Sequence, residues 1–305
     1  MHRFVQHGLV ASVLASLSAA VAPVSGAISP TAFTSSVAGS TGAVSNPNGA
    51  LGSFATSEGG YAIDPFFPPY PQSASASGGA ILATIGSSSA TYSSSLTLEF
   101  SKSLPVSAGT YLGVYSSVGL INVQTTPGEQ PQAATGTTPA QLELSAPSEA
   151  IVSVSADGRN FVALNSGNPI AFDNPTNAYT TVDDTVVTSA GYTFVSPQPA
   201  APGQTPQLAS PTPFLGSLSE FSGMTEPQIL QALGGTAGGT WINVNAAGLS
   251  SIEYVRFTVP AGDTAYINAA ALSDPPVATP EPAAWALLLI SILALPVRKG
   301  WKKSA

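Results

Sequence analysis

Apolar and polar residues alternate along several short stretches of the chain, as they do in half-buried β-strands. In residues 94–100, Leu96, Leu98 and Phe100 fall on one face and Thr97 and Glu99 on the other. Apolar or alternating stretches predict further strands at 80–85, 109–115, 120–124, 141–145, 240–245, 251–259 and 264–272. We therefore expect an all-β fold, an antiparallel β-sandwich.

Two segments carry sharper local signals. Residues 150–164 predict a β-hairpin, because Asp157-Gly158 suits a type I′ turn in which both central residues have positive φ. Residues 225–228 read Thr-Glu-Pro-Gln, which matches a capping box, and Gly234 can end the helix that follows. We expect one short helix that caps one end of the β fold.

The face that each strand residue takes follows from the same alternation. In residues 251–259, Ile252, Tyr254 and Arg256 are expected to face opposite to the apolar residues Val255, Phe257 and Val259. Arg159, beside the predicted turn, is expected to be a solvated charge.

Amino-acid composition separates residues 28–275 into a lead-in and a folded domain. Residues 28–79 include a long stretch rich in Ser, Ala, Gly and Thr, which predicts a loosely ordered lead-in to a sandwich domain at 80–275. Within that domain, residues 196–213 hold six prolines and no charge, and this predicts an extended loop.

The N-terminus has the features of a secretory signal peptide. Arg3 supplies a positive start, residues 8–21 form an apolar run, and Ser25-Gly26-Ala27 is a small-residue cleavage site. We expect residues 1–27 to be removed and the mature chain to begin near Ile28. The alternative is an uncleaved anchor, and either reading sends the body across the inner membrane.

Residues 283–297 carry no charge and predict a transmembrane helix. At about 1.5 Å per residue the helix would reach about 22 Å, short of a membrane core of about 30 Å, and Trp285 and Trp301 extend it at both ends. The basic tail that follows would remain cytoplasmic and leave the body outside; it consists of Arg298, Lys299, Lys302 and Lys303. The alternative is an ordinary buried or anchoring helix. A helix buried in a soluble domain would not explain the four cations of the basic tail.

This helix and its flanks resemble a known sorting segment. Pro280-Glu281-Pro282, the apolar stretch and the basic tail together are similar to the PEP-CTERM sorting signal of exported bacterial proteins, within residues 276–305. The resemblance implies an exosortase-type processing enzyme as a partner. It also implies an inner-membrane intermediate that is then delivered to the cell surface or to an extracellular exopolysaccharide matrix.

Charge and composition exclude several kinds of function. Residues 28–279 contain three Lys or Arg and fifteen Asp or Glu, a formal charge of −12, so nucleic acid is not an expected partner. The chain has no Cys, and both His residues, His2 and His7, lie in the signal peptide. This excludes Ser-His-Asp and Cys-His catalysis, His-ligated zinc and thiol redox chemistry in the mature protein.

One polar segment has the residue types of a calcium site. Hard oxygen ligands are what Ca²⁺ uses, and they cluster between residues 165 and 188 as Asp173, Asn174, Asn177, Asp183 and Asp184. The spacing matches no EF-hand loop. The alternative is a turn-rich, solvated loop in which Asn and Asp bond their own backbone. We expect no other cofactor.

A second resemblance covers residues 80–274. The alternating strand at 94–100, the Val-Ser-Ala-Asp-Gly-Arg-Asn-Phe hairpin, the Ile-Leu helix before Gly-Gly and the Tyr-Val-Arg-Phe-Thr-Val strand are similar, in that order, to discoidin-like (galactose-binding-like) surface proteins. This implies a jelly-roll-like sandwich, an architecture that often binds carbohydrate through loops at one end. No ligand-binding residue can be carried over from it.

Two functional classes remain. The first is a noncatalytic surface or matrix protein whose sandwich is an interaction module, with extracellular polysaccharide as a possible ligand. The second is a carboxylate-dependent glycoside hydrolase, which needs a pair of Asp or Glu. The candidate acids are Glu99, Glu143, Glu149, Glu253 and Asp263, and the sequence distinguishes none of them. We favour the noncatalytic class, and expect no enzyme.

Overall fold

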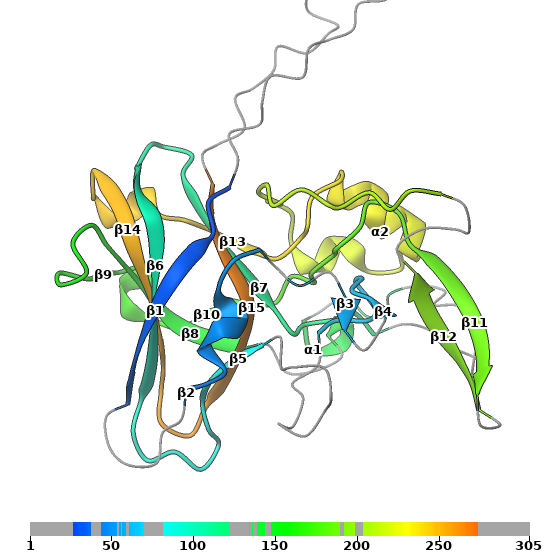
Figure 1. Ribbon diagram of the computed structural model, residues 1–305, viewed down its shortest axis with the longest axis horizontal. Coiled ribbons are helices and arrows are strands. Elements are labelled where there is room, and N and C mark those ends of the chain that lie inside the picture. The colour runs from blue at the N-terminus through cyan, green and yellow to red at the C-terminus, as the bar shows by residue number, and fades with distance from the viewer. Residues whose placement is uncertain are drawn as a thin grey trace, which may run out of the picture. The chain divides into compact units, whose positions relative to one another are not determined.

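The larger part of the structure consists of two antiparallel sheets that face one another (Figure 1). The computed structural model describes residues 27–37, 44–53, 55, 57–58, 61–69, 82–121, 134, 136, 139–143, 148–189, 192–198 and 204–273. The first sheet runs through β1 (Pro30–Val37), β6 (Ser94–Pro105), β14 (Ser251–Val259), β8 (Ser148–Ser155) and β10 (Ile170–Phe172), and β9 (Val162–Ala163) also pairs with β8.

The second sheet runs through β13 (Thr240–Asn243), β7 (Tyr111–Ser116), β15 (Thr264–Ser273), β5 (Ala83–Gly86) and β2 (Val44–Ser45). Two small ribbons pair β3 (Ser57–Glu58) with β4 (Tyr61–Ala62), and β11 (Asp183–Ser189) with β12 (Tyr192–Gln198). All of these pairings are antiparallel, so the predicted all-β antiparallel sandwich is confirmed.

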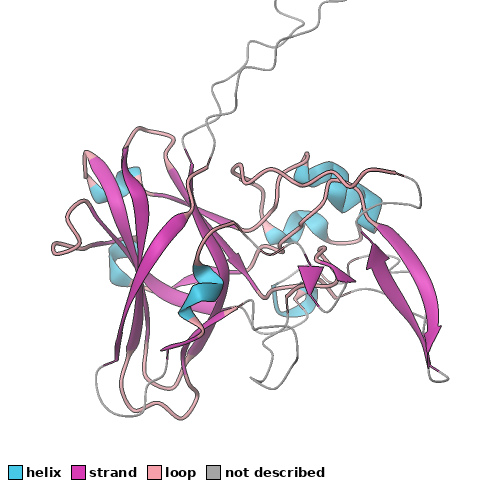
Figure 2. Cartoon of the chain, in the orientation of Figure 1, coloured by secondary structure: helices cyan, strands magenta, loops and turns pink. Residues whose placement is uncertain are grey.

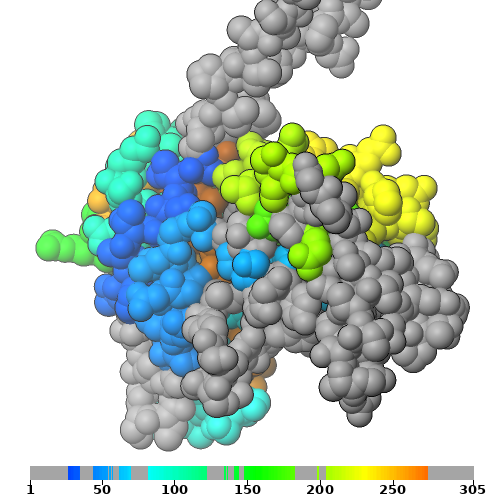
Figure 3. All heavy atoms as spheres, turned by 45° about the vertical axis from the view of Figure 1, so that its right-hand side comes forward, coloured from blue at the N-terminus to red at the C-terminus, as the bar shows by residue number. Residues whose placement is uncertain are grey.

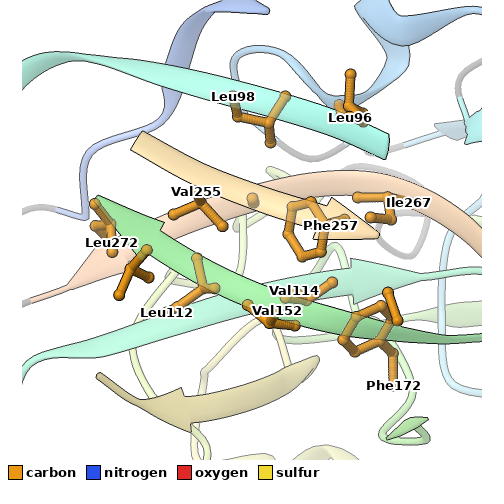
Figure 4. Packing of buried hydrophobic residues seen from close by; sticks show 14 of the residues in the cluster. Leu96, Leu98, Leu112, Val114, Val152, Phe172, Val255, Phe257, Ile267 and Leu272 are labelled. Atoms are coloured by element: carbon orange, nitrogen blue, oxygen red, sulfur yellow. The ribbon is translucent and has the colours of Figure 1, made fainter. Parts of the chain in front are cut away.

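Side chains from both sheets meet in the main hydrophobic core (Figure 4). On β6, Leu96 and Leu98 are fully buried while the residues between them are half-buried, as the alternation predicts. Phe257 of β14 packs edge-on against Phe172, with ring centroids 5.9 Å apart. Burying one such side chain stabilises the folded state by about 1.5–3 kcal/mol, so this core supplies much of the stability of the fold.

The second sheet is buried on both of its faces. Leu112 and Val114 of β7 point into the sandwich core, whereas Tyr115 belongs to a second cluster on the opposite face. The partner strand shows the same division, with Ala270 in the first cluster and Ala269 in the second. Strands covered on both sides lose the alternation of apolar and polar residues, which explains the Ala-rich sequence of β15.

A layer of helices and loops covers the outer face of the second sheet. Its longest helix, α2 (Glu226–Leu233), begins as the capping box predicts, because the Thr225 backbone N–H donates to Gln228 Oε1 at 2.8 Å. It ends at Gly234, whose φ of 61° suits glycine. The layer also contains α1 (Pro139–Leu142) and η3 (Leu218–Phe221). The other helices in Figure 2 lie beside the two sheets; they are η1 (Pro47–Ala50), η2 (Asn165–Gly167) and η4 (Asn245–Ala247).

Three predicted segments differ in part from the structure. The extended loop expected at 196–213 is wrong at its start, because β12 continues as a paired strand to Gln198. The loosely ordered lead-in is wrong for β1, which pairs along most of its length with β6 and forms an edge of the first sheet. Small polar residues can form an edge strand when the neighbouring strand supplies the hydrogen bonds. The strand expected at 141–145 is also wrong at its start, since residues 139–142 are helical and Leu142 packs in the helical layer.

Two local predictions hold only in part. The hairpin of β8 and β9 is present, but its loop is longer than two residues, and Gly158 has positive φ whereas Asp157 does not. The alternation along β14 breaks at an irregularity between Ile252 and Tyr254. Such a bulge shifts the side-chain register by one residue, so Ile252 turns into the core beside Val255.

The residues just before β1 are joined to the end of β15 by an isolated bridge. Ile28 and Leu272 exchange two backbone hydrogen bonds of 2.9 Å each. The predicted signal peptide, apart from Ala27, and the predicted sorting segment lie outside the described residues. In the part of the chain that is described, no helix is long and apolar enough to cross a membrane.

Candidate functional site

The outer face of the first sheet carries the most varied group of accessible side chains. Residues that alternate with the core residues of β6 and β14 point away from the sandwich, and the β8–β9 loop folds onto them. We call the central group the outer-face cluster: Thr97, Glu99, Phe161, Tyr254 and Arg256.

Arg256 is held from two sides. Its Nε donates to Thr97 Oγ1 at 3.1 Å, across the register pair that joins β14 to β6. Its guanidinium carbon lies 3.6 Å from the centroid of the Phe161 ring, which is a cation–π contact. The guanidinium is therefore fixed in place while its side chain remains half-buried.

Tyr254 is the second ring of the cluster. Its hydroxyl donates to Glu99 Oε1 at 3.3 Å, and partial burial together with the nearby carboxylates of Glu99 and Glu253 raises its pKa. The ring also packs against Gly158, where an added Cβ would lie 3.2 Å from the ring. Tyr254 therefore stays protonated and acts as a hydrogen-bond donor near neutral pH.

Asp157 organises the loop that packs against the Tyr254 ring and carries Phe161. Its carboxylate accepts hydrogen bonds from the backbone N–H groups of Arg159 and Asn160, each at 2.8 Å, and from the Ser155 hydroxyl at 3.0 Å. These bonds, together with one from the Asn160 side chain, hold the pKa of Asp157 well below its ordinary range. The green segment of loop 156–161 stands out from the surface in Figure 3.

The cluster combines the groups that recognise a hydroxyl-rich ligand. It offers a fixed guanidinium as a donor, the Glu99 carboxylate and the Tyr254 oxygen as acceptors, and two aromatic rings. Of this group, the sequence had named only Glu99 as a candidate, as one of five acids for a hydrolase. The signals in the sequence were the outward positions of Thr97 and Glu99 on one strand and of Tyr254 and Arg256 on another.

The predicted calcium residues are spread over several places. Asp173 and Asn174 directly follow β10, whereas Asp183 and Asp184 begin β11. The Asn177 amide nitrogen donates to the Tyr179 carbonyl at 2.7 Å. Among the described residues, no three His, Cys, Asp or Glu side chains gather as a metal-binding group.

A different acid lies near Asp173. Glu143 follows α1, forms a backbone bridge with Leu120 and is only 5% exposed. Burial and the charge of Asp173 raise its pKa to about 7, and burial also raises the pKa of Asp173. In the sequence, Glu143 was a candidate acid for a hydrolase and Asp173 a candidate calcium ligand. The fold brings the two residues within electrostatic range of one another.

The other candidate acids lie in several places. Glu99 and Glu253 lie near Tyr254 on the outer face, Glu149 is exposed on β8, and Asp263 is exposed in the turn after β14. Among the residues whose side-chain burial is described, Tyr92 is the one large aromatic residue that is exposed, at 52%.

The predicted sorting residues lie beyond the described part of the chain, so the structure adds nothing to them; they are Pro280, Glu281, Pro282, Arg298, Lys299, Lys302 and Lys303.

Comparison of the chain with protein-family models, with curated proteins and with solved structures finds no match.

Proposed function

We propose that the chain is an exported protein of the cell surface or extracellular matrix, sorted through its C-terminal PEP-CTERM segment. The support comes from the two ends of the sequence, a signal peptide at 1–27 and the Pro-Glu-Pro, apolar and basic elements of 276–305. An exosortase-type enzyme at the inner membrane is the processing partner in this proposal.

The body of the protein is, in this proposal, a jelly-roll-like interaction module that binds polysaccharide and has no catalytic activity. The outer-face cluster carries the proposal, because its donor, acceptors and rings are those that pair with sugar hydroxyls and sugar faces. A formal charge of −12 over residues 28–279 would repel acidic polymers. The expected ligand is therefore a neutral polysaccharide.

Affinity gel electrophoresis with neutral polysaccharides, together with a glycan array, tests this function. Arg256→Ala removes the guanidinium that Thr97 and Phe161 fix, and should weaken binding about tenfold or more. Lys102→Ala is the matched control, since it removes one exposed positive charge from β6 outside the cluster. Equal binding by both variants, or no binding by the wild-type protein, would contradict the proposal.

The sorting proposal has a separate test. Replacing Pro280, Glu281 and Pro282 with Ala should leave the protein in the inner-membrane fraction, because the processing enzyme would no longer recognise its segment. Cell fractionation and immunoblotting measure this distribution. Release of the variant at the wild-type rate would refute the sorting function without bearing on polysaccharide binding.

A glycoside hydrolase is the second candidate, and one observation favours it. The pKa of about 7 for Glu143 would keep its carboxyl partly protonated near neutral pH, as a general acid requires, with Asp173 nearby. Glu143 is nevertheless only 5% exposed, so substrate would need the layer to open. Reducing-sugar release that Glu143→Gln abolishes would establish this alternative over the noncatalytic one.

A further inference from the structure

Glu143 and Asp173 lie within electrostatic range of one another, Glu143 directly after α1 and Asp173 directly after β10. The segment before Glu143 is fixed by the Leu142 carbonyl, which accepts from Ile121 N–H at 2.7 Å. The segment before Asp173 is fixed by the Ser116 hydroxyl, which donates to the Phe172 carbonyl at 3.0 Å. The backbone thus holds two mutually repelling carboxylates near one another.

Buried oxygen atoms in this region lack hydrogen-bond donors. Neither carboxylate oxygen of Glu143 has a donor among the described residues, and neither has Oδ1 of Asn174, a residue that is 7% exposed. The other polar groups of Asn174 are engaged, since its backbone N–H donates to Thr240 Oγ1 at 3.2 Å and its Nδ2 to the Gly216 carbonyl at 3.4 Å. Because about nine in ten buried polar groups in proteins are paired, these oxygens call for a hydrogen-bond donor or a cation.

The body offers no side chain to neutralise this pair. Residues 28–279 contain three Lys or Arg and no His. Lys102 and Arg159 are exposed, and Arg256 lies beneath Phe161 in the outer-face cluster. A positive partner for Glu143 and Asp173 would therefore have to come from solution.

We propose that Glu143, Asp173 and Asn174 bind a hard divalent cation, and that the ion is Ca²⁺. Carboxylate and amide oxygens are Ca²⁺ ligands, and backbone carbonyls or water complete its six to eight contacts. Calcium sites of extracellular modules have dissociation constants of about 0.1–1 mM, and an affinity in this range suits an exported protein. The ion would cancel the repulsion between the two acids and fasten the helical layer to the sandwich. This site is independent of polysaccharide binding.

Thermal unfolding of the full-length protein, stripped with EDTA and then titrated with Ca²⁺, tests the site. Binding to the folded state alone should raise the Tm by about 3–10 °C at about 10 mM Ca²⁺, and calorimetric titration should show saturable heat. If Ca²⁺ neither raises the Tm of the wild-type protein nor produces saturable heat in the titration, the proposal is overturned. An equal or larger response to Mg²⁺ would overturn the assignment of the ion.

Two variants locate the site. Glu143→Gln and Asp173→Asn keep the side-chain shape and should abolish the rise in Tm, while their Tm without Ca²⁺ should match or exceed that of the wild type. Glu149→Gln, an exposed acid on β8, is the matched control and should keep the full response. A response that persists in both site variants would refute the proposal. If Glu143→Gln fails to fold, calorimetric titration of Asp173→Asn with Ca²⁺ tests the site: loss of the heat supports it, and wild-type heat refutes it.

Discussion

Gly113 is the residue at which the packing of the helical layer can be tested most directly. It lies on β7, opposite Trp241 of β13, and a Cβ added to it would lie 2.7 Å from two carbons of the Trp241 ring. The ring cannot move away freely, because its Nε1 donates to the Gly238 carbonyl at 2.8 Å and its edge packs against Tyr115. Gly113→Ala should therefore destabilise the protein, although Ala suits a strand better than Gly.

The expected magnitude follows from two opposing effects. Overpacking a filled site costs about 1–3 kcal/mol, whereas replacing Gly by Ala inside a strand contributes about 0.5–1 kcal/mol. We expect a net loss of about 1–2 kcal/mol in the free energy of unfolding, measured by urea denaturation with far-UV circular dichroism at an unchanged m-value.

A second substitution separates this clash from any general effect on the strand. Trp241→Leu removes the ring atoms that the new Cβ would meet, so Gly113→Ala should cost little or nothing in that background. The two substitutions should therefore couple by about 1–2 kcal/mol in a double-mutant cycle. An equal cost in both backgrounds, or no cost in the wild-type protein, would refute the packing argument.

Two further predictions concern the core and the loop over the outer face. Phe257→Ala should lower the free energy of unfolding by about 3–5 kcal/mol in urea titrations, and an equal loss from Thr258→Ala, its half-buried neighbour, would contradict this. The lowered pKa of Asp157 means that its carboxylate stabilises the fold above its ordinary pKa of 3.8, and that this contribution is lost as the pH falls further. Asp157→Ala should thus lower the Tm relative to the wild type at pH 7, and lower it by less at about pH 2. A difference in Tm between the two proteins that does not change with pH would contradict the hydrogen bonds of the loop.

Local sequence determined much of the sandwich. The alternation in residues 94–100 identified β6 and its buried face, and Thr225 to Gln228 together with Gly234 identified both ends of α2. These features depend on neighbours within a few residues, so a single stretch of sequence contains the whole signal.

Long-range packing decided the remainder of the fold. No local pattern marks β1, because its polar residues form a strand only through the hydrogen bonds that β6 provides. Likewise, the bulge that turns Ile252 into the core depends on the register between β14 and β6.

The candidate sites divide in the same way. Composition alone shows that residues 28–279 contain no His or Cys and only three cations, and the terminal signals alone predict the sorting segment, because neither depends on the fold. Only the tertiary structure placed Phe161 over Arg256, and Glu143 near Asp173, since each pair joins residues far apart along the chain. Such pairs form where separate strands and loops converge, and the backbone path that brings them together is fixed by the packing of the whole body.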